Sequence, residues 1–197
     1  MKVIFLGTPE FSGPILRGLV HAGHKVAAVF TMCDKAAGRG RKIVSPQVKT
    51  AAEKLNLPVY QFPKISSPEG VSAIRETKAE LGVVAAFGEI ISKEVLQSLP
   101  YGFLNVHASI LPRWRGAAPV QHAILAGDKE TGVTIIKMVE KMDAGPILVQ
   151  AETKIDKNET AGELSTALSK IGAQAIVAAL TMIEQGHNNC WIEQDKS

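Results

Sequence analysis

The sequence predicts an α/β protein whose central sheet is mostly parallel. A short apolar run at residues 3–6 is followed by apolar residues at helical spacing from Phe11 to Leu19 and by a second apolar run at residues 25–30. Strand, helix and strand within about thirty residues form a βαβ unit, which makes its two strands parallel. Residues 82–87 are apolar throughout, as is typical of a strand buried on both faces. These features indicate a Rossmann-like α/β fold of three layers.

The remaining elements follow from apolar periodicity and from helix caps. We expect strands at 58–60, 133–136 and 147–149, and helices at 46–55, from Ser67, at 117–125 and after Thr160, where a capping-box pattern opens a long amphipathic helix. Residues 32–45 are predicted to form a loop. The turn at residues 7–9 lacks a G-x-G-x-x-G pattern, so we do not infer a dinucleotide ligand.

The bulk properties are those of one globular domain. The chain has 197 residues, of which 46% are hydrophobic, enough to bury a real core. No apolar run approaches the ~20 residues of a membrane span, and the N-terminus does not resemble a signal peptide. Cys33 and Cys190 lack the spacing of a zinc site or of a redox pair, so we expect no metal. These properties predict a cytoplasmic protein that does not contact a membrane.

Positive charge is concentrated in one stretch. Between Thr31 and Lys49 the chain has five basic residues and the single acid Asp34, a local charge of +4 within a net charge of +3. Glycines alternate with cations at residues 38–42, and such a strip can follow a phosphate backbone. A solvated surface loop is the alternative interpretation.

Polar side chains gather at the end of a predicted strand near residue 105. In an extended strand, side chains two positions apart share a face, so Asn105, His107 and Ser109 are expected to point the same way. An amide donor beside an imidazole suits a reaction that builds negative charge on an oxygen and moves a proton next to it. Asp143, in a polar break between two apolar strands, is a candidate to orient the imidazole. A structural histidine at a strand end is the alternative.

Four motifs of the sequence have a characteristic order and spacing. They are Asn105-Val106-His107, the run Leu111-Pro112-Arg113-Trp114-Arg115-Gly116-Ala117-Ala118-Pro119, then Thr131-Gly132-Val133-Thr134 and Asp143-Ala144-Gly145. Together they resemble the catalytic domain of the methionyl-tRNA formyltransferases, from Lys2 to about Gly186. The Asn-x-His and Asp-x-Gly elements are similar to those of all formyltransferases that use 10-formyltetrahydrofolate. The run from Arg113 to Pro119 is particular to the methionyl-tRNA enzymes.

The resemblance implies a Rossmann-like formyltransferase fold and an enzyme of translation initiation and one-carbon metabolism. The reaction would transfer a formyl group from the co-substrate 10-formyltetrahydrofolate to the α-amino group of methionyl initiator tRNA, through a non-covalent tetrahedral intermediate. Asn105, His107 and Asp143 would be the catalytic residues, with no metal ion. We expect a monomer.

The resemblance also implies two sets of binding residues. The folate contacts would be Phe87, Gly88, Ile90, Ser109, Leu111 and Pro112. The tRNA contacts would be Arg39, Arg41, Lys42, Arg113, Trp114 and Arg115. Guanidinium groups bind phosphates bidentately, and an indole stacks on a base. The alternatives are that the first three residues are core and turn, and that Trp114 packs on its own loop while the arginines face water.

Members of the family that this chain resembles continue through a linker into a second, barrel-like tRNA-binding domain. We therefore expect residues 1–186 to be the formyltransferase catalytic domain and residues 187–197 to be the start of a linker. The barrel domain itself is expected to be absent from this chain.

Two other functions remain open from the sequence. A formyltransferase for a small amine acceptor, such as an amino sugar nucleotide, would need neither the basic strip nor Trp114. A folate-binding or tRNA-binding module without catalysis would not need Asn105, His107 and Asp143 together. Both are therefore less consistent with the residues than the methionyl-tRNA reaction.

Overall fold

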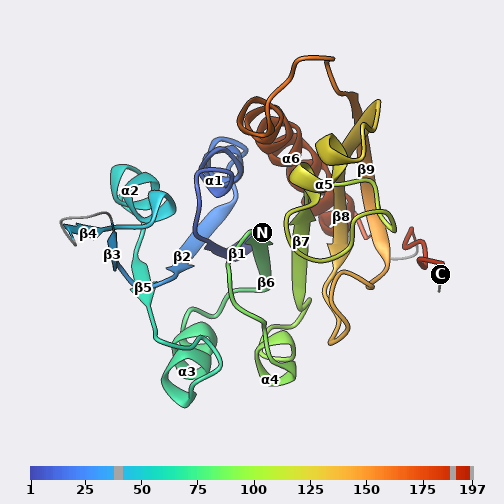
Figure 1. Ribbon diagram of the computed structural model, residues 1–197. Helices are drawn as coiled ribbons and strands as arrows, with labels where there is room; N and C mark the ends of the chain where they lie inside the picture. Colours follow the sequence, from blue (N-terminus) through green and yellow to red (C-terminus); the bar gives the residue numbers. More distant parts are fainter. Residues whose placement is uncertain (38–41, 187–189, 196–197) are drawn as a thin grey trace.

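One sheet of seven strands crosses the middle of the molecule (Figure 1). The computed structural model describes residues 1–37, 42–186 and 190–195. The strand order is β5 (Val59–Gln61), β2 (Lys25–Thr31), β1 (Lys2–Gly7), β6 (Leu81–Ala85), β7 (Phe103–His107), β8 (Glu130–Lys137) and β9 (Ile147–Lys154). The first five strands are parallel, whereas β8 is antiparallel to both β7 and β9. The prediction of a mostly parallel sheet is confirmed.

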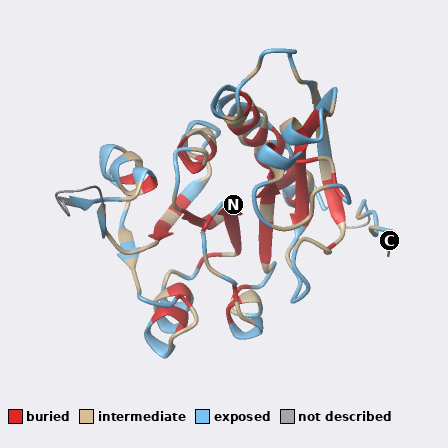
Figure 2. Ribbon diagram, in the orientation of Figure 1, coloured by how far each residue is buried: buried red, intermediate tan, exposed pale blue. Residues whose placement is uncertain are grey.

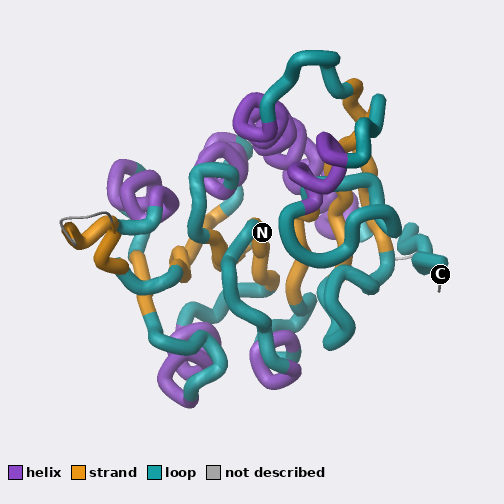
Figure 3. The backbone as a smooth tube through the Cα atoms, viewed as in Figure 1, coloured by secondary structure: helices purple, strands orange, loops and turns teal. Residues whose placement is uncertain are grey.

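Helices cover both faces of this sheet and complete three layers (Figure 3). One face carries α1 (Ser12–His21), α2 (Gln47–Lys54), α5 (Pro119–Leu125) and α6 (Ala161–Glu184), and the other carries α3 (Pro68–Glu76) and α4 (Lys93–Leu96). The predicted three-layer fold is therefore confirmed, although the short helix α4 is not among the predicted elements.

Side chains of β1 point alternately into two hydrophobic cores, one on each face of the sheet. Val3 and Phe5 are buried with residues of α1, α2 and α6, whereas Ile4 and Leu6 are buried with residues of α3 and α4. This follows from the period of two in a strand, which sends neighbouring side chains to opposite faces. Figure 2 shows the result, with buried strands in the middle and exposed outer surfaces on the helices.

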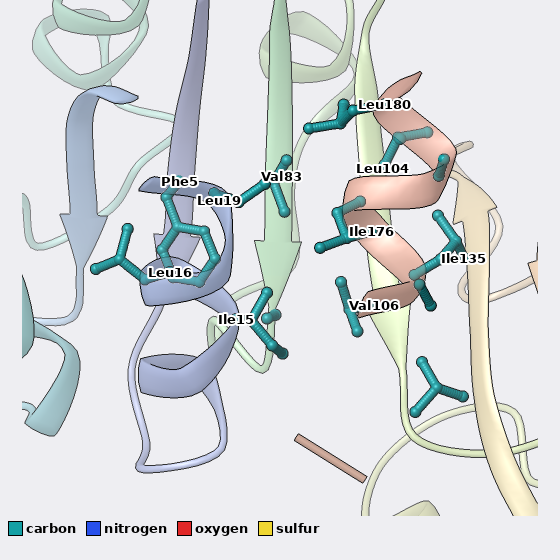
Figure 4. Packing of buried hydrophobic residues seen from close by; sticks show 14 of the residues in the cluster. Phe5, Ile15, Leu16, Leu19, Val83, Leu104, Val106, Ile135, Ile176 and Leu180 are labelled. Atoms are coloured by element: carbon teal, nitrogen blue, oxygen red, sulfur yellow. The ribbon is translucent and has the colours of Figure 1, made fainter. Parts of the chain in front are cut away.

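Helix α6 is the long helix predicted after Thr160. The hydroxyl of Thr160 accepts a hydrogen bond from the backbone N–H of Glu163, whose carboxylate accepts one from the N–H of Thr160. Ile176 and Leu180 pack with strand residues in the larger core (Figure 4). By length and hydropathy alone α6 could cross a membrane, but 44% of its apolar 18-residue stretch is buried inside the fold. Its apolar stripe is that of a core helix, as predicted.

The segment predicted as a loop at residues 32–45 contains a β-hairpin instead. Strands β3 (Lys35–Ala37) and β4 (Lys42–Val44) pair antiparallel as a separate two-stranded sheet. The loop prediction is wrong because it rests on glycines and cations and ignores the β-branched pair Ile43-Val44, which favours a strand.

A polar cluster ties the base of this hairpin to the main sheet. We call Asp34, Ser45, Lys49 and Gln61 the Asp34 cluster. The carboxylate of Asp34 accepts hydrogen bonds from Lys49 Nζ at 2.8 Å, from Gln61 Nε2 at 2.8 Å and from Ser45 Oγ at 3.2 Å. The hydrogen bond from Lys49, followed by that from Gln61, holds the pKa of Asp34 below its ordinary value. The cluster therefore links the hairpin to α2 and β5.

Candidate functional site

A cavity of about 700 Å³ opens at the carboxyl ends of β6 and β7. The chain passes from β1 through β2 to β5 on one side of β1 and then returns to β6 on its other side, so the strand order reverses at β1. Crevices at such a reversal are where open α/β sheets bind ligands. The main lining segments are residues 86–91, 105–108, 116–121 and 138–140, together with Met142, Asp143 and Gly145.

The three side chains predicted to be catalytic meet at this cavity. Asn105 Nδ2 donates to Asp143 Oδ1 at 3.1 Å, and His107 Nδ1 lies 3.6 Å from Asp143 Oδ2. The backbone N–H of Gly116 donates to the same Oδ2 at 2.9 Å. The side chains of His107 and Asp143 are only 6% and 12% exposed, so little water screens them. We call Asn105, His107, Gly116 and Asp143 the Asp143 cluster.

The imidazole of His107 is oriented from its far side. Its Nε2 lies 2.9 Å from the backbone carbonyl oxygen of Trp114. Because a carbonyl oxygen can only accept, Nε2 carries a hydrogen and donates it. The backbone carbonyl thus fixes a hydrogen on Nε2 and turns the other ring nitrogen, Nδ1, toward Asp143.

Left-handed backbone is concentrated around the cavity. Ala86, Trp114, Ala118 and Asp143 have φ angles of +47°, +61°, +58° and +48°, in a region that L-residues rarely adopt. Each such residue costs on the order of 1–3 kcal/mol and persists only where its surroundings enforce it. Three of the four line the cavity, and the carbonyl of the fourth, Trp114, accepts from His107. The loops of the site are thus held in one shape by their contacts.

Gly145 explains the glycine of the Asp-x-Gly motif. A Cβ atom on this residue would lie 1.7 Å from the carbonyl oxygen of Lys137, at the end of β8. Only glycine allows the two backbones to approach this closely. The close contact fixes the loop that carries Asp143 against β8.

The residues predicted to bind folate divide into two groups. Phe87, Gly88 and Ile90 line the cavity, and Ile90 is 76% exposed at its edge. The carbonyl of Phe87 accepts a hydrogen bond from the Thr8 hydroxyl at 2.5 Å, which joins the turn after β1 to this wall.

Ser109, Leu111 and Pro112 lie elsewhere. The expectation that Ser109 shares a face with Asn105 and His107 is wrong, because β7 ends at His107 and the chain turns there. The buried hydroxyl of Ser109 donates to the carbonyl of Arg113 at 2.6 Å, and Leu111 packs in a small buried cluster with Ile136 and Ile147. Pro112 is exposed.

The Arg-Trp-Arg segment is tied to the protein by Asp128. Arg113 donates to this carboxylate from Nε at 3.1 Å and from Nη2 at 2.7 Å, and Trp114 Nε1 donates at 2.7 Å. These hydrogen bonds, led by those of Arg113, hold the pKa of Asp128 below its ordinary value. The indole also stacks on His122, with ring centroids 5.4 Å apart. Trp114 is therefore held by α5 and by Asp128, outside its own loop.

The other residues predicted to bind tRNA are placed less fully. Arg115 donates from Nε and Nη2 to Gln194 Oε1. Arg39 and Arg41 lie outside the described residues, and the side chain of Lys42 is not described either.

Comparison with known proteins decides the family. A sequence profile described as formyl transferase matches residues 1–180. This chain belongs to the formyl transferase family. The resemblance inferred from its motifs is thereby confirmed at the level of the family.

Relatives within the formyl transferase family are similar over most of this chain. The chain is 48% identical over 185 residues to the methionyl-tRNA formyltransferase of Halorhodospira halophila, which covers 94% of this chain and 59% of that protein. It is 45% identical over 186 residues to the methionyl-tRNA formyltransferase of Symbiobacterium thermophilum, covering 94% of this chain and 57% of that one. The chain thus spans less than two thirds of the length of these curated relatives.

Several solved structures have the same fold as this chain. Glycinamide ribonucleotide transformylase 1 from Symbiobacterium toebii aligns with a TM-score of 0.81 at 17% identity, covering 99% of this chain and 94% of that one. A formyltetrahydrofolate deformylase from Pseudomonas syringae aligns with a TM-score of 0.77 at 20% identity, covering 98% of this chain and 66% of that one. At these identities the similarity supports the fold alone, which confirms the predicted Rossmann-like formyltransferase architecture.

Two residues that sequence reasoning missed also hold the site loops of this chain. Asp128 follows α5 in a surface turn, and Gln194 lies in the polar segment after α6. Neither belongs to a motif, and both reach the site only through contacts distant in sequence. The arginines of the site loop are the one signal that could have found them, since guanidinium groups need hydrogen-bond acceptors such as a carboxylate or an amide oxygen.

Proposed function

We propose that this chain transfers a formyl group from 10-formyltetrahydrofolate to the α-amino group of methionyl initiator tRNA. The observation that carries the proposal is the meeting of Asn105, His107 and Asp143 at the wall of one cavity in a formyl transferase fold. The choice of acceptor is supported by the similarity to proteins named methionyl-tRNA formyltransferase, at 48% and 45% identity.

The first chemical requirement is a donor for the oxygen of the formyl group. Attack of a neutral amine on the formyl carbon turns this oxygen into an oxyanion. Asn105 has two amide hydrogens and gives one of them to Asp143, and the second, which has no partner among the described residues, can donate to the oxyanion. A donor in this role is worth about 2.7–4 kcal/mol of barrier.

The second requirement is movement of a proton from the attacking amine to the departing nitrogen. His107 holds a hydrogen on Nε2 through the Trp114 carbonyl, so Nδ1 is the ring nitrogen that would take up this proton, beside Asp143. The carboxylate of Asp143, 3.6 Å away, would stabilise the positive charge that forms on the ring. The proton then passes to the leaving nitrogen, and no covalent bond to the protein is needed.

The cavity suits a formyl donor of folate size. Its volume of about 700 Å³ lies within the usual range for small-molecule sites, ~300–1,000 Å³. Apolar side chains such as Phe87 and Ile90 offer a surface for a flat ring, and Gly88 leaves the backbone accessible beside them. We propose these three as donor contacts, with Ser109, Leu111 and Pro112 shaping the chain behind the catalytic residues.

The acceptor tRNA would approach along the basic hairpin and the Arg-Trp-Arg segment. We propose Arg39, Arg41 and Lys42 as contacts of the phosphate backbone, in view of the positive charge of residues 31–49. Arg113 is 59% exposed, so it can exchange part of its bonding to Asp128 for a phosphate. Trp114 and Arg115 complete this proposed surface.

Three further assignments go with the proposed reaction. Residues 1–186 would form the catalytic domain and residues 187–197 would lead out of it. A monomer in the cytoplasm would meet charged tRNA and folate there, with no metal in the chemistry.

Measurement of product with a panel of acceptors tests this proposal. The protein is mixed with 10-formyltetrahydrofolate and either methionyl initiator tRNA, free methionine or an amino sugar nucleotide, and the formylated products are identified by mass spectrometry. Formyl-methionyl-tRNA as the main product supports the proposal. Formylation of the amino sugar nucleotide alone would show that the acceptor is a small amine, and donor binding without any product would indicate a binding module.

A further inference from the structure

The segment after α6 packs against the site loops. Ile192 and Ile147 exchange two backbone hydrogen bonds of 2.8 Å, which adds a bridge at the start of β9. Trp191 packs against the larger core. Figure 1 shows residues 190–195, in red, beside β9. Residues 190–195 therefore have a defined position, although the sequence suggests only a polar linker.

Gln194 makes the most specific contacts in this segment. Its Nε2 donates to the carbonyl oxygens of Asp143 at 2.9 Å and of Gly145 at 2.7 Å. Its Oε1 accepts from Arg115 Nε at 3.0 Å and from Arg115 Nη2 at 2.8 Å. The amide can adopt only this orientation, because carbonyls do not donate and a guanidinium does not accept. Both ends of the side chain are thus fully used.

These contacts close a ring around the Asp143 cluster. Arg115 directly precedes Gly116, whose N–H donates to Asp143 Oδ2. The side chain of Gln194 bonds to Arg115 through its amide oxygen and to the backbone carbonyl of Asp143 through its amide nitrogen. The carboxylate is therefore tied to Gly116 both directly and through Gln194.

We propose that Gln194 is a positioning residue for formyl transfer, one that joins the loop of Asp143 to the loop of Arg115 and so sets the place of the Asp143 carboxylate. The inference rests on the proposed function for its kinetic consequence. Its structural part stands on the hydrogen bonds alone. Asp143 needs such support because its backbone has a φ of +48°.

Two substitutions of Gln194 and one control separate positioning from general stability. Gln194→Met keeps the length and volume of the side chain but removes its strong hydrogen bonds. Gln194→Glu keeps an acceptor for Arg115 and loses both donors to the carbonyls. Glu193→Gln is the control, because Glu193 is the exposed neighbour in the same segment.

The first readout is the backbone amide of Gly116 in a ¹H–¹⁵N NMR spectrum. A hydrogen bond to a carboxylate is short and strong, so this proton resonates downfield. We expect it to shift upfield in Gln194→Met and Gln194→Glu, with most other resonances unchanged, and to stay in place in Glu193→Gln. An unmoved Gly116 amide in both Gln194 variants would overturn the inference, whether or not the wild-type protein transfers formyl groups.

The second readout is the division of the kinetic effect between kcat and KM. A misplacement of a catalytic group by about 1 Å can cost on the order of 100-fold in rate. We expect kcat to fall about 10-fold to 100-fold in both Gln194 variants, with the KM for the formyl donor within about twofold. Unchanged kcat beside a shifted Gly116 amide would overturn the positioning role. Absence of transfer by the wild-type protein would instead contradict the proposed function.

Discussion

Two polar clusters lie near the carboxyl ends of parallel strands, and they are built in different ways. In the Asp34 cluster, the carboxylate takes direct hydrogen bonds from a cation and an amide at 2.8 Å. In the Asp143 cluster, the carboxylate takes hydrogen bonds, within the described part of the chain, only from uncharged groups, and the imidazole of His107 stays 3.6 Å away. The first cluster is satisfied by the protein, whereas the second retains bonding capacity beside a cavity.

The backbone shows the same contrast. Asp143 has a φ of +48° and lies among other left-handed residues, which means that its neighbours enforce an unfavourable conformation. Asp34 is held by an ion pair at the base of a hairpin. We infer that Asp34 fixes structure and that Asp143 serves chemistry. Four predictions test this contrast, from the largest expected effect to the smallest.

Replacement of the imidazole should give the largest effect. His107→Gln keeps a polar side chain but removes the group that moves the proton, and general acid–base catalysis is typically worth about 10²–10⁴-fold. We expect kcat for formyl transfer to fall within that range. His21→Gln is the control, because His21 is exposed on the last turn of α1. Equal losses in both variants would mean that histidine at position 107 has no special role.

Removal of the amide donor should give the next effect. Asn105→Ala loses the proposed hydrogen-bond donor to the oxyanion, and the expected loss of about 2.7–4 kcal/mol corresponds to about 10²–10³ in kcat. The affinity for 10-formyltetrahydrofolate, measured by titration calorimetry, should change little, because the amide stabilises negative charge that develops only during the reaction. A large loss of donor affinity with unchanged kcat would make Asn105 a binding residue instead.

A pair of glycine substitutions should change stability in opposite directions. In Gly145→Ala the new methyl group meets the Lys137 carbonyl, and forced overpacking costs about 1–3 kcal/mol, each of which lowers Tm by about 2–4 °C. Gly162→Ala in α6 has open space and should gain about 0.4–1 kcal/mol. Thermal unfolding measures both. A Gly145→Ala protein as stable as the wild type would contradict the close backbone contact.

The smallest effect concerns the pH dependence of the Asp34 cluster. Because the folded state lowers the pKa of Asp34, this group contributes stability above its unfolded pKa of about 3.9, and the contribution is lost as the pH falls through the lower folded pKa. Asp34→Asn should therefore lower Tm slightly at pH 7, and the difference from the wild type should shrink near pH 3. A difference that does not depend on pH would rule out the ion pair as its cause.

The predictable part of this molecule is the part set by local pattern. Apolar runs and helix caps predict the parallel strands and α6, since burial and capping depend on neighbouring residues. The sequence also predicts that Asp143 lies beside His107, although the two residues are far apart in the chain, whereas the hydrogen bond from Asn105 to Asp143 is seen only in the structure. Alternation of side chains along a strand fails to place Ser109, because the pattern does not show that β7 ends at His107.

The unpredictable part depends on contacts between distant segments. Gln194 is one glutamine in a polar stretch, and nothing in its neighbours indicates that it bonds to Asp143 and Arg115. Asp128 likewise has no local feature that links it to Trp114. Strands β3 and β4 flank a stretch of glycines and arginines whose composition is typical of a loop, so charge and glycine content alone mislead.

Single-turnover formyl transfer with Asp143→Asn tests the central claim most directly. Wild-type protein, Asp143→Asn and the exposed control Asp156→Asn are each mixed in excess with labelled 10-formyltetrahydrofolate and methionyl initiator tRNA. The account predicts product with the wild type and with Asp156→Asn, and a rate lower by about 10²–10⁴-fold with Asp143→Asn. Formyl transfer by Asp143→Asn at the wild-type rate would contradict it.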